Sequence, residues 1–458
     1  MSYTMVKKTI LFAFLSICFL QGATQNYPTK LTAVDKIYGL SKLWQEVNYN
    51  FAFFHQVTDL QFDSLYKAYI PSVIKSANDY EYYRMLKKFC ATLNDGQTVV
   101  YFPEYINDSI DAPPIKIKSF GNKYFVVNTG KLLSEKLPVG SEIQRINGFA
   151  SQDFFDSEVL PYISASTGHT RREIAECTVL SGWKNTKVLL TYCTPGGEIK
   201  NGFFFRNTDD AQWVFPVKDD RKPVTLGWPE KDIALLTINT FKDENVIKEF
   251  NRNLRKLKGA KGIILDLRNN KGGSTMIAAS ILCSFTSDPF LVAAGYKTRN
   301  HIAAFKALGK HYVERNIPSE YNSYYNNDSW HLHPPDTLFC DKNREILDER
   351  LIVLVSPTTA SAAEDFLIML AGIYGRAQMV GETTYGSTGQ PLVFDMPGGG
   401  RAMVCTKCDY LPNGNDFAGT GIAPHHEVKP DIKDFLNGED VVLNKALEII
   451  NVTVPEEN

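Results

Sequence analysis

A serine before a predicted helix is the first residue whose position suggests chemistry. Ser361 lies in the run SPTTASAAE (356–364), between the apolar run 351–355 and the helix-like segment 365–374. The unpaired backbone N–H groups of a helix start can stabilise an oxyanion beside an attacking hydroxyl. A capping box is the alternative, because Glu364 follows three residues later and the hydroxyl would then only satisfy the helix terminus. The local sequence favours the cap.

A second candidate is the glycine pair in RNNKGGS (268–274), which directly follows the buried, strand-like run 262–267. Gly272 and Gly273 have no Cβ, so their backbone amides can approach a ligand closely. An ordinary strand-to-helix turn explains the same residues, and the run lacks the spacing of a phosphate-binding loop. Alone, this motif indicates little.

Several segments in a common order carry a resemblance to a known family. LDLRNNKGGS and the later TASAAE resemble the two hallmark segments of the tail-specific, or C-terminal-processing, serine peptidases, a family that includes the tricorn core. VGETTYGSTGQ and GTGIAP follow in the family's order. LSKLWQEVNYNF and LNDGQTVVYFP resemble its N-terminal helical domain, and LPVGSEIQRING resembles part of a PDZ-like module. The matching segments extend from Leu40 to Pro424.

The resemblance implies a role for each matching residue. Ser361 would be the nucleophile, and the amide of Gly272 or Gly273 would form the oxyanion hole together with that of Ala362. No metal or organic cofactor is implied. The partner would be a polypeptide, whose C-terminal end the PDZ-like module commonly helps to place. The oligomeric state is not indicated.

The general base does not follow from the resemblance. Where the bacterial processing branch has a lysine this chain has Ser387, and where the tricorn-like branch has a histidine it has Gln97. Neither a hydroxyl nor an amide can act as a base near neutral pH. The glutamate that the tricorn branch carries before GTGIAP is not evident, and His425 or His426, directly after it, is a weak substitute.

Three hypotheses therefore remain open. The first is a secreted serine endopeptidase that uses Ser361, and the second is a pseudo-peptidase that binds polypeptides without cleaving them, since the base position is Gln97. The third is a small-ligand binder in which the aromatic and polar stretch 312–333 forms a lid. Such a stretch is more often a surface insertion.

The elements expected around these residues form a multidomain α/β protein. Residues 24–111 are predicted to be an N-terminal helical domain, 112–207 a PDZ-like β-rich module, 208–229 a linker, 230–440 a crotonase-like α/β peptidase core and 441–458 a C-terminal tail. Helix-like apolar spacing supports the first domain and alternating strand and helix patterns the core. The apolar residues of the first pattern are Leu40, Leu43, Trp44, Val47, Phe51, Phe54, Leu65, Tyr66, Tyr69 and Ile70.

The composition and the N-terminal residues indicate which partners and which cellular location to expect. The 458 residues carry 49 Lys plus Arg against 51 Asp plus Glu, so no basic field attracts nucleic acid. Lys7 and Lys8 precede an apolar run, which predicts a signal peptide over residues 1–23. We expect export to the periplasm or beyond, without a lipid anchor.

The cysteines and histidines give no metal framework by spacing alone. Seven cysteines follow the signal segment, an odd number from which no disulfide pairing can be assigned. Cys405 and Cys408 form a CxxC without a second pair nearby, and structural cysteines are the better interpretation. His331 and His333 are expected to be ordinary loop histidines.

Overall fold

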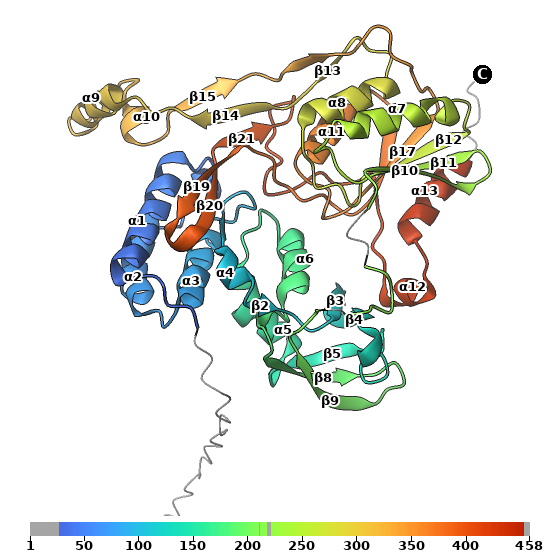
Figure 1. Ribbon diagram of the computed structural model, residues 1–458. Helices are drawn as coiled ribbons and strands as arrows, with labels where there is room; N and C mark the ends of the chain where they lie inside the picture. Colours follow the sequence, from blue (N-terminus) through green and yellow to red (C-terminus); the bar gives the residue numbers. More distant parts are fainter. Residues whose placement is uncertain (1–26, 210, 218–220, 453–458) are drawn as a thin grey trace, which may run out of the picture.

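The computed structural model describes residues 27–209, 211–217 and 221–452, arranged as a mixed α/β protein of several units (Figure 1). The predicted signal segment, residues 1–23, lies outside the described residues. None of the described helices has the length and apolar character needed to cross a membrane.

The N-terminal unit is a helical layer that is completed by a hairpin from the far end of the chain. Its helices are α1 (Ala33–Asn50), α2 (Phe62–Lys75) and α3 (Asp79–Ala91). Strand β1 (Val99–Tyr101) pairs with β20 (Gly400–Cys405), which pairs with β19 (Pro391–Met396). The buried faces of the helices and of this hairpin form one hydrophobic core (Figure 1).

The second unit is an antiparallel sheet in the order β3-β4-β5-β8-β9, with the short β6 (Phe149–Ala150) beside β5. The sheet strands are β3 (Ile115–Phe120), β4 (Lys123–Thr129), β5 (Glu142–Ile146), β8 (Lys187–Cys193) and β9 (Ile199–Phe205). The helices α5 (Ser151–Phe154) and α6 (Gly168–Thr178) accompany it. The strands alternate buried and exposed residues, because only one face of the sheet meets the core.

The third unit is a sheet in the order β10-β11-β12-β17-β18-β22, in which every neighbouring pair after β10-β11 is parallel. Its strands are β10 (Val224–Glu230), β11 (Ile233–Ile238), β12 (Gly262–Asp266), β17 (Arg350–Val355), β18 (Ala377–Gly381) and β22 (His426–Glu427). All five residues of β12 are buried, as expected for a parallel strand covered on both faces.

Helices cover both faces of this sheet. On one face, Ile263 and Leu265 share a core with α7 (Asn245–Leu257), α8 (Thr275–Leu282) and α11 (Ala362–Ala371). On the other face, Ile264 packs in a separate core with α13 (Val441–Asn451). The buried strands and helices expected from the sequence are present here.

Two segments differ in character from the predicted domain scheme. Strand β10 begins at Val224, inside the segment predicted as a linker, and it pairs with β11. Helix α13 occupies most of the described part of the segment predicted as a tail, and it covers a face of the sheet. The polar, proline-containing composition of the first segment is typical of a linker, although its end forms a strand.

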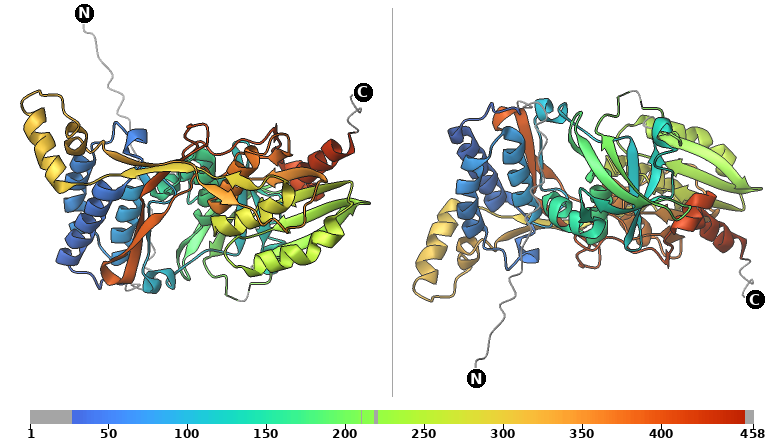
Figure 2. Two further views of the ribbon diagram at one scale, coloured as in Figure 1. Left: turned by 90° about the horizontal axis from the view of Figure 1, so that it is seen from above. Right: turned by 90° about the horizontal axis from the view of Figure 1, so that it is seen from below.

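A long arm leaves the third unit and reaches the first (Figures 1 and 2). It contains β14 (Gly295–Arg299), α9 (Ala303–Val313), α10 (Asn322–Tyr325) and β15 (Trp330–His333). A disulfide between Cys283 and Cys340 joins the two chain segments at its base. Toward its tip, His301 Nε2 lies 2.7 Å from the Tyr49 carbonyl oxygen at the end of α1. The stretch 312–333 is thus part of an insertion that rests on the helical unit.

Candidate active site

The Ser361 loop and the glycine loop follow neighbouring parallel strands. β12 pairs with β17 along their whole length, from Gly262 opposite Arg350 to Asp266 opposite Leu354. The carboxyl ends of parallel strands meet at one edge of a sheet, which is where such folds place their ligands. Residues 267–274 and 356–361 therefore lie side by side, although about ninety residues separate them in the sequence.

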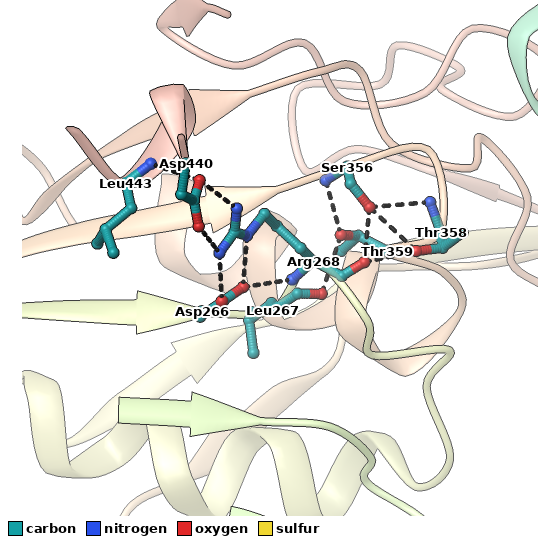
Figure 3. Close-up of polar contacts among 8 residues, drawn as sticks. All are labelled: Asp266, Leu267, Arg268, Ser356, Thr358, Thr359, Asp440 and Leu443. Carbon is teal, nitrogen blue, oxygen red and sulfur yellow. Dashed lines mark hydrogen bonds and ion pairs between the residues drawn. The ribbon is translucent and has the colours of Figure 1, made fainter. Parts of the chain in front are cut away.

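Hydroxyl groups hold the two loops together (Figure 3). Ser356 Oγ donates to the Arg268 carbonyl oxygen at 2.6 Å and Thr358 Oγ1 donates to the same oxygen at 2.5 Å. Thr359 Oγ1 donates to the Leu267 carbonyl oxygen at 3.0 Å. The polar residues before Ser361 thus donate to backbone carbonyls just after β12, and the Leu267 carbonyl oxygen also accepts the Asn270 N–H at 3.0 Å.

The Arg268 guanidinium anchors the glycine loop from the other side. It donates to Asp266 and to Asp440, with the nearest N to O distance 2.8 Å in each pair (Figure 3). Burial disfavours the Arg268 charge, but hydrogen bonds and the charges of both carboxylates outweigh it and raise its pKa. The same contacts outweigh burial at Asp440 and lower the pKa of that carboxyl. Asp440 also caps α13.

Ser361 has an unusual backbone conformation at the start of α11. Its φ of 55° and ψ of −126° lie outside the regions that L-residues favour, which costs about 1–3 kcal/mol. Ser361 and Glu364 hold the two positions of a capping box, and the Glu364 carboxylate accepts the Ser361 N–H at 3.3 Å. The half-buried Ser361 side chain has the placement of a capping residue, but the Glu364 N–H that it would bind donates to the Ser361 carbonyl oxygen at 2.6 Å. The hydroxyl is available for another partner.

Gly272 allows the glycine loop to approach Ser361. It has a φ of +90°, and a Cβ there would lie 2.8 Å from the Ser361 Cβ and 2.7 Å from the Ala360 carbonyl oxygen. Only glycine fits this position without strain. The paired glycines therefore do more than turn the chain, because they bring its backbone against the serine.

The amides beside Ser361 differ in their partners. The Gly272 N–H donates to Asn270 Oδ1 at 2.9 Å, so it is occupied. In the part of the chain that the structure describes, no hydrogen bond uses the N–H groups of Gly273 or Ala362. Asn270 is fully buried, and its Nδ2 donates to the Ile238 carbonyl oxygen at 3.1 Å, which fixes the loop.

Glu364 organises a third loop beside the serine. Its carboxylate accepts hydrogen bonds from Thr384 Oγ1 at 2.5 Å, from the Gly386 N–H at 2.7 Å and from the Ser387 N–H at 3.2 Å. Glu364 is fully buried, and burial raises the pKa of its carboxyl to about 7 against the effect of these donors. The segment 384–387 is thereby held next to the start of α11.

The turn that carries Gln97 packs against this third loop. Gly96 lies against the Tyr385 ring, since a Cβ on it would be 2.7 Å from the Tyr385 hydroxyl oxygen. Gln97 is half-buried and lies beside Gly389. No hydrogen bond between Gln97 and Ser361 is present in the described structure, and Ser387 Oγ is buried without a hydrogen-bond partner.

Residues 232–428 match the sequence model of peptidase family S41. This segment is an S41 peptidase domain. The match includes both the Ser361 loop and the glycine loop, so both motifs belong to the segment that is similar to the S41 serine peptidases.

Curated relatives extend the likeness beyond the S41 domain. The chain is 25% identical to a carboxyl-terminal-processing protease of Synechocystis, over 97% of this chain and 95% of the relative. It is 24% identical to a protease of the same name from Picosynechococcus, over 76% and 73% of the two chains. The likeness to the first relative therefore includes the N-terminal and β-rich units.

A solved structure has the same fold. Mature CPAF, solved in complex with lactacystin, superposes with a TM-score of 0.70 at 15% identity, over 92% of this chain and 99% of CPAF. At this identity the comparison establishes the arrangement of the chain and not its chemistry.

The histidines of the S41 domain that follow GTGIAP have partners on the sheet. His425 Nδ1 accepts the Met379 N–H at 3.0 Å, and His426 Nε2 lies 3.0 Å from Gln378 Oε1. Both partners belong to β18, because β22 is the strand at that edge of the sheet. None of the hydrogen bonds of the described residues joins either histidine to Ser361.

Several residues around the S41 site carried no signal in the sequence. Glu364 was interpreted only as a capping residue, although it organises the segment 384–387. His169, from α6 of the β-rich unit, places Nε2 2.7 Å from the Thr384 carbonyl oxygen. Asp95 is buried, and burial raises its pKa although hydroxyls and an amide donate to it. These contacts join residues distant in sequence, so no local pattern could reveal them.

Proposed function

We propose that this chain is exported to the periplasm or beyond and that its S41 domain hydrolyses peptide bonds through Ser361. The observation that supports this best is the position of Ser361 at a helix start and against Gly272, where the hydrogen bonds of the described residues leave the N–H groups of Ala362 and Gly273 unused. In this proposal the β-rich unit is a PDZ-like module and the large sheet is a crotonase-like core.

The chemistry would proceed in two steps. Ser361 Oγ attacks the carbonyl carbon of a peptide bond, the amine departs with a proton, and an acyl-enzyme forms. Water then attacks the ester and releases the acid. The oxyanion in each step would accept hydrogen bonds from the N–H groups of Ala362 and Gly273, where the dipole of α11 adds to the effect. Gly272 supplies space, since its own amide is bound to Asn270.

A cleft near this site is suited to a polypeptide. A cavity of ≈ 860 Å³ lies between the helical unit and the β-rich unit and reaches Gly96 and Tyr385. Its charged lining residues are Arg84, Lys87 and Arg206 against Glu158. Aromatic rings complete the lining, and the Arg84 guanidinium lies 4.0 Å from the centre of the Tyr162 ring.

The positive charge of this cleft favours a partner that carries a carboxylate. Within the described structure, neither Arg84 nor Lys87 forms an ion pair. Burial, with a smaller effect from Arg84, lowers the pKa of Lys87, so a bound carboxylate would stabilise its charged form. A C-terminal carboxylate is one such group, in agreement with a module that places the end of a polypeptide.

The position of Gln97 favours a second function, that of a polypeptide-binding pseudo-peptidase. Neither Gln97 nor Ser387 can accept a proton near neutral pH. Without a base, the oxyanion hole and substrate binding retain roughly 10³ to 10⁴-fold acceleration over water. The cleft would still bind a polypeptide in this case.

Labelling with a fluorophosphonate probe tests the nucleophile. The wild-type protein is expected to react and Ser361→Ala is not. Ser356→Ala, in the same loop, is the matched control, because the Ser356 hydroxyl bonds to the Arg268 carbonyl oxygen and to Thr358 and has no hydrogen bond to Ser361. A folded wild-type protein that does not react contradicts the proposed role of Ser361.

Replacement of Gln97 by histidine separates the two functions. If the protein is a pseudo-peptidase, Gln97→His raises peptide hydrolysis while peptide affinity changes little. If the wild type already cleaves peptides and Gln97→His does not change the rate, the pseudo-peptidase function is wrong. Lys87→Glu is expected to weaken peptide binding in either case, since it reverses a charge in the cleft.

A further inference from the structure

A mixed cluster of metal-binding side chains lies outside the S41 site. His55 Nε2 is 3.9 Å from Asp416 Oδ2, and Cys408 Sγ is 3.9 Å from Asp416 Oδ1. One ligand atom from each residue lies within 4.8 Å of the other two. The Asp416 carboxylate thus stands between an imidazole and a thiol, with one oxygen toward each.

Backbone contacts hold the three residues in place, although they come from distant segments. The Ala52 N–H donates to the Cys405 carbonyl oxygen at 3.1 Å, which joins the segment before His55 to the strand before Cys408. Gln56 Nε2 donates to the Ala418 carbonyl oxygen at 3.1 Å. An isolated β-bridge between Tyr410 and Asp416 fixes the third residue. The cluster therefore belongs to the tertiary fold and not to one flexible loop.

The donor set matches the preferences of zinc. Zn²⁺ binds imidazole, thiolate and carboxylate in tetrahedral geometry, with bonds of about 2.0–2.3 Å. Neighbouring ligand atoms are then about 3.5 Å apart. The imidazole and the thiol each lie 3.9 Å from a different Asp416 oxygen, and the three ligand atoms lie within 4.8 Å of one another, so zinc binding requires an inward movement of the side chains.

Zinc can reach the cluster from solvent. His55 and Asp416 are exposed, with 37% and 41% of their side-chain surfaces accessible, whereas Cys408 is buried. His55 also lines a cavity of ≈ 470 Å³ that includes Trp330. Three protein ligands leave a fourth position for water, and an entry path exists on the exposed side.

The positive charge of a neighbouring lysine partly disfavours the binding of a metal cation. Lys297 lies opposite Cys408 in the β14–β21 pairing, where β21 spans Lys407–Tyr410. Its Nζ is 4.0 Å from Asp416 Oδ2. It also lies 5.6 Å from the centre of the Trp330 ring, which offers the ammonium a second contact when zinc takes the carboxylate. The cation therefore competes with zinc without blocking it.

We propose that His55, Cys408 and Asp416 bind one Zn²⁺ ion that connects the helical N-terminal unit to the β21 region of the S41 domain. In the sequence, His55 precedes the glycine and serine loops, and Cys408 and Asp416 follow them. The cluster takes no part in the proposed peptidase chemistry. The ion would stabilise the contact between two segments that are more than 350 residues apart.

Cobalt substitution tests the thiolate ligand directly. The metal-free, full-length protein is titrated with Co²⁺, and the wild type is expected to show the near-ultraviolet charge-transfer absorption of a cobalt–thiolate bond, which Zn²⁺ then removes. Cys408→Ser is expected to lose this absorption. Cys405→Ser is the matched control, because Cys405 is also buried in the same CxxC but is outside the cluster.

Two exposed ligands give a test that does not depend on a core substitution. His55→Ala and Asp416→Asn are each expected to weaken zinc binding at least 10-fold. The loss of a group that only hydrogen-bonds to a metal ligand already weakens binding by about this factor, and these residues are proposed as ligands themselves. Zinc is expected to raise the melting temperature of the wild type and not of these variants. No cobalt–thiolate absorption in the wild type, absorption that survives Cys408→Ser, or unchanged zinc affinity in both exposed variants would overturn the proposal.

Discussion

The two sides of the candidate active site are built in different ways. On the nucleophile side, Ser361 is held by the fold itself, since its loop is bonded to the end of β12 and its helix packs in the main core. On the other side, Gln97 is a half-buried side chain in a turn whose structural contacts are made by its neighbours Asp95 and Thr98. The Ser361 side is therefore held by hydrogen bonds and core packing, whereas the other side depends on the single side chain of Gln97.

This difference shows which parts of the candidate site the fold itself constrains. Removing a member of the nucleophile network leaves buried charges or carbonyls without partners, which costs stability. Changing Gln97 removes no such partner, because the neighbouring Thr98 hydroxyl donates to Asp95 at 2.6 Å and its oxygen accepts the Cys405 N–H at 3.1 Å. Folding therefore constrains the Ser361 side of the candidate site and leaves position 97 free to vary.

The largest effect is expected for Arg268→Met. This change leaves the buried Asp266 and the partly buried Asp440 without their shared cation, and it should lower the free energy of unfolding by about 3–5 kcal/mol. Denaturant titration measures the change. Lys445→Met on α13, which breaks the exposed pair with Glu448, should cost less than about 1 kcal/mol. Equal effects would show that the Arg268 network is not structural.

A pH-dependent effect is expected from Glu364. Its folded pKa of about 7 lies above the ordinary value of 4.5, so the folded state holds a proton that the unfolded state releases. The associated stability is present below pH 4.5 and is lost as the pH rises through 7.

The matched measurement compares the wild type with Glu364→Gln between pH 4.5 and pH 7.5. The wild type is expected to lose up to about 3 kcal/mol relative to the variant across this range. Asp365, whose pKa burial raises to about 6, titrates in both proteins and cancels in the difference. Parallel pH profiles would contradict the burial of an ionisable Glu364.

Gly272→Ala is expected to destabilise the protein less than the changes above and to abolish labelling by the fluorophosphonate probe. The new methyl group would meet the Ala360 oxygen, the Ala362 nitrogen and the Ser361 Cβ at 2.7–2.8 Å, in addition to the strain of φ +90°. We expect about 2 kcal/mol of destabilisation and no reaction with the fluorophosphonate probe. Gly259→Ala has a similar φ of +84° with nothing within 4 Å, so it should lose stability and retain labelling.

The smallest effect is expected for Gln97→Ala. Because the Gln97 side chain forms no hydrogen bond in the described structure, its removal should change the free energy of unfolding by less than about 0.5 kcal/mol. Asp95→Ala, two residues earlier, removes the acceptor of the buried Thr98 hydroxyl and should cost about 2 kcal/mol. A large loss for Gln97→Ala would remove the contrast between the two sides of the site.

The sequence by itself determined the loop that carries Ser361 and the mixed α/β class of the fold. The order of LDLRNNKGGS and TASAAE indicated a tail-specific serine peptidase, which the S41 match of this segment supports, and the apolar runs at 262–267 and 351–355 indicated buried strands of an α/β core. Such features are local, because a strand, a turn and a helix start each depend on residues close together in the chain. The hydrophobic pattern therefore predicted the elements that carry Ser361 and the glycines.

Only the tertiary structure decided which groups act together. That the Gly272 amide is occupied and the Gly273 amide is not depends on Asn270 and on the pairing of two distant strands. The raised pKa of Glu364 depends on burial against the segment 384–387, and the cluster of His55, Cys408 and Asp416 joins the two ends of the chain. Burial and long-range contacts have no period in the sequence, so these properties arise only when the chain is folded.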